Sequence, residues 1–315
     1  MDYRILGNTG LNVSRLCFGS LTIGPLQANL PLKEGVRVLD AAFDNGINLI
    51  DTAELYNNYM YIKKAIKNRR SRVIVSTKSY AYSKETAEKS LKKALEEMDT
   101  DYIDIFSLHE QESEHTIRGH YEAIEYFIKA KEKGIIRAIG ISTHAVAAVK
   151  ASLKYTEIEV VHPIINIAGL GIIDGSKEEM LQAIEEAARA GKGIYSMKAL
   201  GGGNLIKNAG ECFDFVINNE NIHSVAVGMQ STAEVINNIA IFEKREVPVE
   251  IQKQIVNKKR KLLIDFWCIG CGSCSKKCNQ NAIEIIDGKA RVNAEKCVLC
   301  GYCSAYCPEF CIKII

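Results

Sequence analysis

The segment Ile47-Asn48-Leu49-Ile50-Asp51-Thr52-Ala53-Glu54-Leu55-Tyr56 decides how the rest of the chain is interpreted. Its apolar part is too short for a core helix and ends abruptly at the carboxylate of Asp51, and a phenol follows five residues later at Tyr56. A short apolar run bounded in this way is typical of a buried strand. In parallel β/α barrels, catalytic side chains follow the carboxyl ends of the strands. We therefore expect this segment to deliver Asp51 and Tyr56 to the mouth of a barrel.

Strand-like runs of this kind occur eight times and alternate with amphipathic helical patterns. The runs are Leu16–Phe18, Leu49–Asp51, Val73–Lys78, Tyr102–His109, Ile136–Ser142, Val160–Ile164, Gly193–Met197 and Ser224–Val227. Helical patterns between them include Lys84–Met98 and Glu178–Ala190. Regular alternation of strand and helix predicts a parallel sheet, and eight repeats over about 240 residues predict an α/β fold, a closed (β/α)8 barrel. An open doubly wound sheet is the alternative.

The N-terminal residues precede this pattern. Tyr3–Gly19 alternates apolar and polar side chains around the turn sequence Gly7-Asn8-Thr9-Gly10. Such a pattern predicts a two-stranded β-hairpin, which we expect to plug the floor of the barrel before its first strand.

The C-terminus contains a second motif. Eight of the eleven cysteines form two runs with the spacing C-x2-C-x2-C-x3-C, at residues 268 to 278 and 297 to 307. This spacing resembles that of bacterial ferredoxins with two 4Fe-4S clusters, in which the fourth cysteine of each run binds the other cluster. The resemblance implies Cys268, Cys271, Cys274 and Cys307 as ligands of cluster 1, and Cys278, Cys297, Cys300 and Cys303 as ligands of cluster 2. Zinc is the alternative, but zinc sites pair two C-x2-C elements without the third and fourth cysteine.

The sequence predicts three parts: a barrel over residues 1–245, a helical linker over 246–263 and an α+β ferredoxin-type domain over 264–315. A lysine-rich helix is expected from Val249 to Leu263, with its charges on a solvated face. Short strands are expected within Ala282–Ile286 and Cys311–Ile315.

Composition narrows the function classes. The chain has 315 residues, 47% hydrophobic and 25% charged, with a net charge of +2. That is enough apolar sequence for a large core, and no basic stripe interleaved with aromatics predicts nucleic-acid binding. No apolar run approaches the roughly 20 residues of a membrane span, and the N-terminus lacks the apolar segment of a signal peptide. We expect a cytoplasmic protein in a reducing compartment.

Residues 1 to 245 resemble the aldo-keto reductases. The resemblance rests on Asp51 and Tyr56, on Lys78 at the end of the third predicted strand, and on His109 at the end of the fourth. It implies Tyr56 as the general acid, Lys78 as the cation that lowers its pKa, Asp51 as the anchor of Lys78, and His109 as the group that orients the carbonyl. Chemistry agrees, because a carbonyl that accepts hydride needs a proton donor and a phenol of pKa near 10 needs a nearby ammonium. Taken singly, Asp51 could be a helix N-cap and His109 a core histidine.

The same resemblance implies a nicotinamide cofactor at the later strand ends. The residues expected to bind it are Gly19, Ser20, Ser142, Thr143, His162, Met197, Gly201, Gly228, Gln230, Glu234 and Asn238. Gly201 begins a glycine run suited to a pyrophosphate, and Ser142 and Thr143 would hold the carboxamide. Glu234 and Gly228 stand where NADP-preferring members have cations, so we expect NADH to bind better than NADPH.

We therefore expect an oxidoreductase that reduces a small-molecule carbonyl or oxidises an alcohol, while the clusters exchange electrons with a partner protein. A hydride carries two electrons and a cluster accepts one, and no flavin motif is recognisable to connect them. The alternative is an electron-transfer or redox-sensing protein whose barrel no longer binds nicotinamide. His162 and Met197 favour it, because they differ from the residues usual at those positions.

Overall fold

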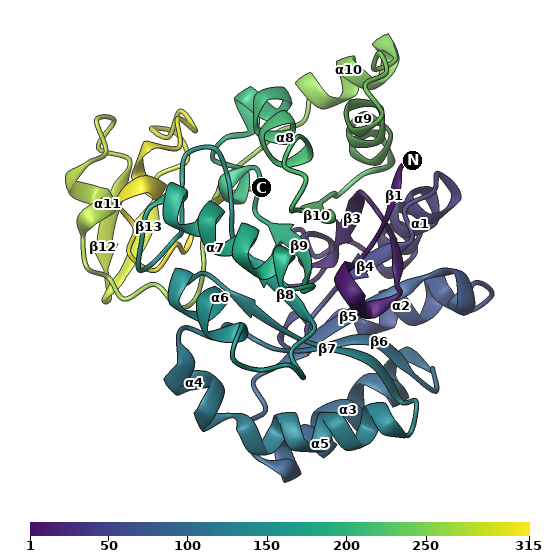
Figure 1. Cartoon of the computed structure of the whole chain (residues 1–315). Helices are drawn as coiled ribbons and strands as arrows, with labels where there is room; N and C mark the ends of the chain where they lie inside the picture. The colour runs from purple at the N-terminus through teal and green to yellow at the C-terminus, as the bar shows by residue number, and fades with distance from the viewer.

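The computed structural model describes residues 1–315, and its centre is a closed barrel of eight parallel strands (Figure 1). The strands are β3 (Leu16–Gly19), β4 (Leu49–Asp51), β5 (Ile74–Ser79), β6 (Ile103–Leu108), β7 (Ile136–Thr143), β8 (Val160–Pro163), β9 (Gly193–Met197) and β10 (Ser224–Gly228). β10 pairs in parallel with β3, which closes the ring. All eight predicted strands are confirmed, and the alternative of an open sheet is wrong.

Helices surround the barrel and connect successive strands. They are α1 (Leu32–Asp44), α2 (Tyr59–Ile66), α3 (Lys84–Met98), α4 (Glu114–Gly119), α5 (Tyr121–Glu132), α6 (Val146–Ser152), α7 (Lys177–Arg189), α8 (Ala209–Ile217) and α9 (Thr232–Phe242). Capping boxes begin three of them: the side chains of Ser83, Ser113 and Ser176 each accept the backbone N–H three residues on. Such caps satisfy N–H groups that the first helical turn leaves free, typically worth about 1 kcal/mol each.

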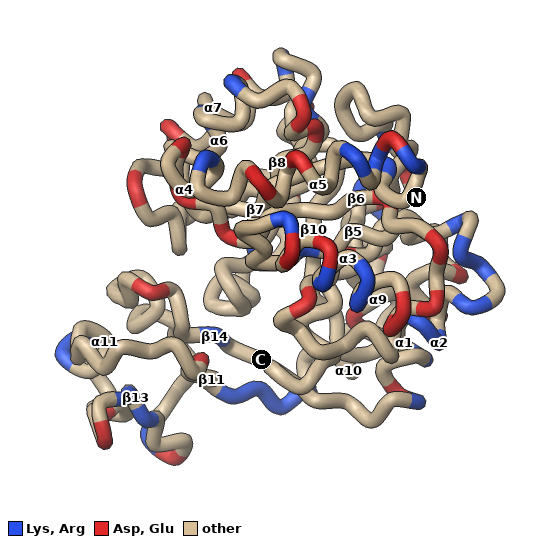
Figure 2. Tube along the Cα trace, turned by 90° about the horizontal axis from the view of Figure 1, so that it is seen from below, with Lys and Arg blue, Asp and Glu red and all other residues tan.

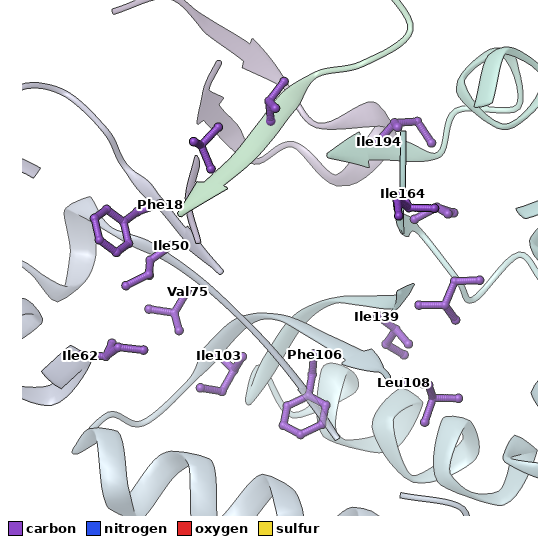
Figure 3. Close-up of a cluster of buried hydrophobic side chains, with 14 of the residues drawn as sticks. Phe18, Ile50, Ile62, Val75, Ile103, Phe106, Leu108, Ile139, Ile164 and Ile194 are labelled. Atoms are coloured by element: carbon purple, nitrogen blue, oxygen red, sulfur yellow. The ribbon is translucent and has the colours of Figure 1, made fainter. Parts of the chain in front are cut away.

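The main core lies between the barrel strands and the helices. Figure 3 shows Phe18, Ile50 and Val75 on neighbouring strands, with Phe106 and Ile139 further round the barrel. All five side chains are at most 1% exposed. Burying each such side chain contributes about 1.5–3 kcal/mol, so this layer fixes the strand ends on which the site residues stand.

The predicted N-terminal hairpin is confirmed. It consists of β1 (Tyr3–Ile5) and β2 (Asn12–Ser14), paired antiparallel, with the 3-10 turn Gly7–Thr9 between them. Leu6, Leu11 and Val13 form a separate buried cluster with residues of the barrel strands. The hairpin therefore plugs the barrel end opposite to the strand ends that carry Asp51 and Lys78.

The segment after the barrel differs from the prediction. Helix α10 covers only Val249–Val256, and Leu262–Ile264 form strand β11, so the predicted helix through Leu263 is wrong in its second half. Leu262 is buried in β11, which pairs antiparallel with the C-terminal strand β14 (Ile312–Ile314). That pairing overrides the local preference for helix. Lys258 and Arg260 are also only partly exposed, so the expectation of a fully solvated basic face is wrong for them.

The cysteine-rich domain has little regular structure. It contains α11 (Ser273–Lys276), the antiparallel pair β12 (Ile283–Ile286) and β13 (Lys289–Val292), and the 3-10 turn η7 (Tyr302–Tyr306). Both predicted short-strand segments are therefore confirmed. Figure 2 shows β14 and the basic segment that precedes β11 between this domain and the barrel. β14 contacts the 3-10 turn η5 (Gly201–Gly203), which follows β9 at the barrel mouth. No helix of the structure has the length and apolarity that a membrane crossing requires.

Candidate functional site

A buried ion pair occupies the ends of β4 and β5. Lys78 is 1% exposed, and its Nζ lies 2.8 Å from Asp51 Oδ1, 2.9 Å from Asp51 Oδ2 and 2.7 Å from the Thr52 carbonyl oxygen. Parallel pairing places Asp51 opposite Ser76, two residues before Lys78. A buried charge persists only when it is paired and hydrogen-bonded, and this lysine meets both conditions.

Tyr195 and His162 complete the surroundings of Asp51. The Tyr195 hydroxyl donates to Asp51 Oδ1 at 2.9 Å and lies 2.8 Å from Ser76 Oγ. The His162 ring stacks on Tyr195 with centroids 3.9 Å apart, and its Nε2 lies 3.7 Å from Asp51 Oδ1. Burial lowers the pKa of His162 to about 4, so its imidazole is neutral at pH 7. Sequence reasoning missed Tyr195, which is one of thirteen tyrosines and lies inside a strand.

Tyr56 lies at the end of the 3-10 turn Glu54–Tyr56, beside this pair. Lys78 Nζ is 5.1 Å from the centre of the Tyr56 ring. Burial raises the pKa of Tyr56 well above its usual value, and the charges of Asp51 and Glu110 add to that rise. The net shift of this pKa is therefore upward, with burial as its largest cause. The role of Lys78, whose Nζ is paired with Asp51, as the group that tunes Tyr56 stays a prediction.

His109 follows β6 and faces Tyr56 edge-on, with ring centroids 5.9 Å apart. Its other neighbour is Tyr80, whose ring stacks on it at 4.7 Å. Burial, helped by the charge of Lys78, lowers the pKa of His109 well below its usual value. Its buried Nδ1 has no hydrogen-bond partner in the protein. The structure therefore brings together all four residues of the predicted catalytic set, with His109 as a neutral imidazole.

A cleft of about 990 Å3, partly open to solvent, runs from Tyr56 and Asp51 to the start of α9. Of the residues expected to bind nicotinamide, six line it: Gly19, His162, Met197, Gly228, Gln230 and Glu234. Gly202 and Gly203 also line it, and all three glycines of η5 have positive φ.

Five expected cofactor residues do not line the cleft. Ser20 accepts from the amide of Asn58, Ser142 Oγ accepts the Glu110 N–H, and Thr143 Oγ1 accepts the Ala145 N–H. Gly201 is buried, and Asn238 is buried with its side-chain oxygen accepting from Asn237. Local turn and helix bonds thus use one side-chain oxygen in each of the other four residues, and the assignment of all five to the cofactor stays a prediction.

Glu234 is not the free carboxylate that the sequence suggested. Its Oε1 lies 2.7 Å from Lys258 Nζ and 3.3 Å from Arg260 Nη2, and its Oε2 accepts the Gln230 N–H at 2.7 Å. Lys258 and Arg260 both line the cleft. These two cations come from the segment after α10, which sequence reasoning placed on a solvated helix. The cleft therefore has positive charge at the end where a carboxylate was expected to repel phosphate.

The residues of the cleft fit a phosphate-bearing dinucleotide. Backbone amides of a glycine-rich turn can approach a pyrophosphate closely, and cations can bind its charge. Besides Lys258 and Arg260, the cleft is lined by Lys198 and Lys313, which the sequence analysis also missed.

The cysteines surround two further cavities. One, of about 570 Å3, is lined by Cys278, Cys297, Cys300 and Cys303. The other, of about 310 Å3, is lined by Cys268, Cys271, Cys274 and Cys307, together with Cys311. No three His, Cys, Asp or Glu side chains converge on a single metal-ion position. The fold thus gathers each predicted set of four around its own cavity, with the fourth cysteine exchanged between runs.

Backbone amides already point at several of these sulfurs. Cys268 Sγ accepts from the N–H groups of Gly270 and Ala290 at 3.5 Å each, and Cys278 Sγ accepts from Ala282 at 3.3 Å. Such N–H···S bonds stabilise the negative charge of thiolate ligands. The donor set therefore fits an iron-sulfur cluster in each cavity.

A closed β/α barrel with a buried lysine–aspartate pair and a tyrosine at its mouth, joined to a domain with two four-cysteine cavities, defines an oxidoreductase with iron-sulfur centres. Residues 15–240 match the aldo/keto reductase family, and residues 261–308 match the 4Fe-4S dicluster domain. The chain belongs to the aldo/keto reductase family and carries a C-terminal 4Fe-4S dicluster domain.

Similar proteins agree with this assignment. The chain is 28% identical over 288 residues to L-galactose dehydrogenase of Arabidopsis thaliana. This match covers 78% of this chain and 89% of that enzyme. It is 31% identical over 201 residues to the uncharacterized oxidoreductase YqkF of Bacillus subtilis, covering 59% of this chain and 61% of that relative. The holo form of the aldo-keto reductase AKR11C1 from Bacillus halodurans has the same fold, with a TM-score of 0.67, 24% identity and coverage of 81% and 95%.

Proposed function

We propose that the barrel binds a nicotinamide dinucleotide in the cleft and reduces a small carbonyl compound, with Tyr56 as the general acid. The observation that carries this proposal is the position of Tyr56, which lines the cleft together with Asp51 and stands beside the buried Lys78–Asp51 pair. Three of the four predicted catalytic groups therefore meet where the cleft reaches the barrel axis.

The Tyr56 hydroxyl is placed to donate the proton that carbonyl reduction requires. When bound, the nicotinamide supplies hydride to the carbonyl carbon. The carbonyl oxygen then gains negative charge, and Tyr56 gives it the phenolic proton. The Tyr56 hydroxyl is protonated at pH 7, but its raised pKa makes it a weak acid, so proton transfer depends on stabilisation of the phenolate by Lys78. Alcohol oxidation would need the phenolate as a base, a form that burial disfavours.

His109 and Lys78 have supporting roles in this proposal. The neutral imidazole of His109 can donate one N–H to the carbonyl oxygen and so orient it beside the Tyr56 hydroxyl. As the proton leaves the phenol, the Lys78 ammonium, 5.1 Å from the centre of the ring, stabilises the developing phenolate. Asp51 holds Lys78 in position.

The cofactor preference needs revision. The expected preference for NADH rested on an unpaired Glu234, and Lys258 and Arg260 neutralise that carboxylate. We propose instead that NADPH binds at least as well as NADH, because a 2'-phosphate at this end of the cleft would meet two cations.

The clusters are proposed to pass electrons, one at a time, to or from a partner protein. Cys271 and Cys300 are exposed, one beside each cavity. Apolar side chains next to them, including Ile269 and Val298, are more than half exposed. A partner that docks beside either cavity would lie close to the cluster held there.

The proposal is tested by assaying NADPH- and NADH-dependent reduction of a panel of aldehydes and ketones. Tyr56→Phe keeps the ring and removes the proton donor, so we expect turnover to fall by about 100-fold or more while dinucleotide affinity is kept. Tyr82→Phe is the matched control, since Tyr82 is 60% exposed and lies outside the cleft. Undiminished turnover in Tyr56→Phe would remove Tyr56 from the chemistry.

A second candidate is an electron-transfer protein whose barrel binds no nicotinamide. The observation in its favour is that the hydroxyls of Ser142 and Thr143, expected to hold the carboxamide, are bonded within the protein. Reversible reduction of the clusters in a protein with no affinity for either dinucleotide would support this candidate.

A further inference from the structure

Two lysines from different domains meet in the cleft without a carboxylate partner. Lys198 follows β9 of the barrel, and Lys313 lies in β14 of the cluster domain. Both line the cleft, and their Nζ atoms lie 4.9 Å and 3.5 Å from the centre of the Phe310 ring. They therefore both lie close to one aromatic side chain, at the interface between the domains.

Neither ammonium forms an ion pair. Lys198 Nζ lies 3.1 Å from His144 Nε2, and Lys313 Nζ donates to the carbonyl oxygen of Phe310. Asp265 acts on both lysines only at longer range, as does Glu110 on Lys198. Lys313 is 4% exposed. Burial lowers the pKa of Lys198 to about 8 and the pKa of Lys313 well below its usual value, and the two groups also repel each other. An anion bound between them in the cleft would stabilise both ammonium groups.

The lysines stand beside the glycine turn. A Cβ on Gly202 would lie 2.7 Å from Lys313 Cδ, and a Cβ on Gly203 would lie 2.0 Å from the Ile314 carbonyl oxygen. The positive φ angles of η5 and the absence of side chains allow β14 to pack directly on this turn. The N–H groups of Gly201 and Gly203 donate to Lys198 and Leu200 within the turn, so the two lysines supply the positive charge beside it in the cleft.

We propose that Lys198 and Lys313 together bind the pyrophosphate of the dinucleotide, so that the cluster domain supplies part of the barrel's cofactor site. This inference rests on the proposed function, since it names the residues that hold that cofactor's charged centre. The position of Lys313 depends on the pairing of β14 with β11, and β14 begins five residues after Cys307. Dinucleotide affinity is therefore linked to the assembly of the domain that contains cluster 1.

The competing explanation is that the two cations only balance the negative thiolates of cluster 1. Lys313 acts electrostatically on Cys307 and Cys311, so this explanation is physically reasonable. It predicts that neutralising either lysine changes cluster stability but leaves dinucleotide affinity unchanged.

The experiment measures dissociation constants for NADPH and NADH by calorimetry on anaerobically prepared, iron-loaded full-length protein. The variants are Lys198→Met and Lys313→Met, with iron content and visible absorbance recorded for each. Loss of a charge-assisted bond predicts affinity weaker by roughly ten- to a hundredfold in each variant. Lys276→Met is the matched control: Lys276 is an exposed lysine of the same domain outside the cleft, and its loss should change affinity by less than about twofold.

Wild-type affinity in both lysine variants would overturn the inference. If Lys313→Met loses its clusters, two other variants decide. Lys198→Met changes only the barrel, and weak dinucleotide binding by it supports the inference. Lys313→Arg keeps the positive charge, and wild-type binding by it supports the inference as well. If wild-type protein binds neither dinucleotide, the proposed function fails. Inorganic pyrophosphate then tests the anion site alone: binding that both Met variants lose supports it, and no binding overturns it.

Discussion

Tyr56 stands at the barrel mouth as a protonated phenol, because burial and the carboxylates of Asp51 and Glu110 raise its pKa. The sequence placed Tyr56, Asp51, Lys78 and His109 at consecutive strand ends, and the structure brings them together. It could not give the sign of the shift in the Tyr56 pKa, which depends first on how deeply the folded chain buries the phenol and then on the charges of Asp51 and Glu110. Tyr195 escaped prediction for a similar reason: nothing in the local pattern shows that its hydroxyl reaches Asp51.

A pH profile tests these protonation states. Reduction needs protonated Tyr56, which is lost only as pH rises through its raised pKa, above 10. It also needs neutral His109, which is present at every pH above its lowered pKa, below 6.5. We expect the single-turnover rate at saturating cofactor to be flat between about pH 7 and 9. A rate that falls within that window would show that the tyrosine pKa is low instead.

The Lys78–Asp51 pair also has a structural consequence. Lys78→Met leaves the Asp51 carboxylate buried, with the Tyr195 hydroxyl as its remaining side-chain hydrogen-bond donor. Breaking a buried ion pair typically costs about 3–5 kcal/mol. We expect that loss in the free energy of unfolding, measured with denaturant under anaerobic conditions. The double variant Asp51→Asn with Lys78→Met removes both charges and should be more stable than Lys78→Met alone. Equal stability of wild type and Lys78→Met would show that Asp51 is solvated.

At the scale of elements, the barrel strands could be predicted because each is a short apolar run buried by both the plug and the helix layer. The segment after α9 could not. Its lysine-rich sequence suits a solvated helix, but Leu262 gains burial by pairing with β14, a strand some 50 residues later. Because the chain leaves the helix and continues as β11, Lys258 and Arg260 lie against Glu234. No local sequence pattern indicates this contact.

The cofactor preference depends on this segment. Lys258→Met removes one of the cations beside Glu234, so we expect NADPH affinity to fall by roughly five- to a hundredfold and NADH affinity to fall less. Lys259→Met is the matched control, because Lys259 is exposed and does not line the cleft. Dissociation constants at low salt decide the matter. An equal loss for both dinucleotides would mean that the 2'-phosphate lies elsewhere.

The contact between η5 and β14 is a second test at this scale. Gly203 has φ +86, and an added Cβ would lie 2.0 Å from the Ile314 carbonyl oxygen, so Gly203→Ala must displace β14. We expect a lower melting temperature and weaker dinucleotide binding. Gly210→Ala, in α8 with no heavy atom within 4 Å, should be neutral or stabilising by up to about 1 kcal/mol. Identical behaviour of the two variants would show that the contact is not maintained in solution.

At the scale of the whole molecule, the two domains share one cleft. The sequence showed a barrel and a cluster module joined by a linker, and it gave no reason for them to touch. The structure places β14 against the glycine turn, so the last residues of the chain form one wall of the barrel's cleft. Such an arrangement brings the cysteines of the cluster 1 set toward the barrel mouth, where we propose hydride chemistry. The one-electron and two-electron steps would need an intermediary.

The central claim is that this shared cleft binds a nicotinamide dinucleotide. The most direct measurement is a calorimetric titration of anaerobically prepared, iron-loaded protein with NADPH and with NADH. We predict that each chain binds one dinucleotide and that NADPH binds at least as tightly as NADH. The expected dissociation constant is on the order of micromolar, which corresponds to a binding free energy of about −8 kcal/mol. Absence of binding of either dinucleotide at millimolar concentration would contradict the account and leave the protein as an iron-sulfur electron carrier on a barrel scaffold.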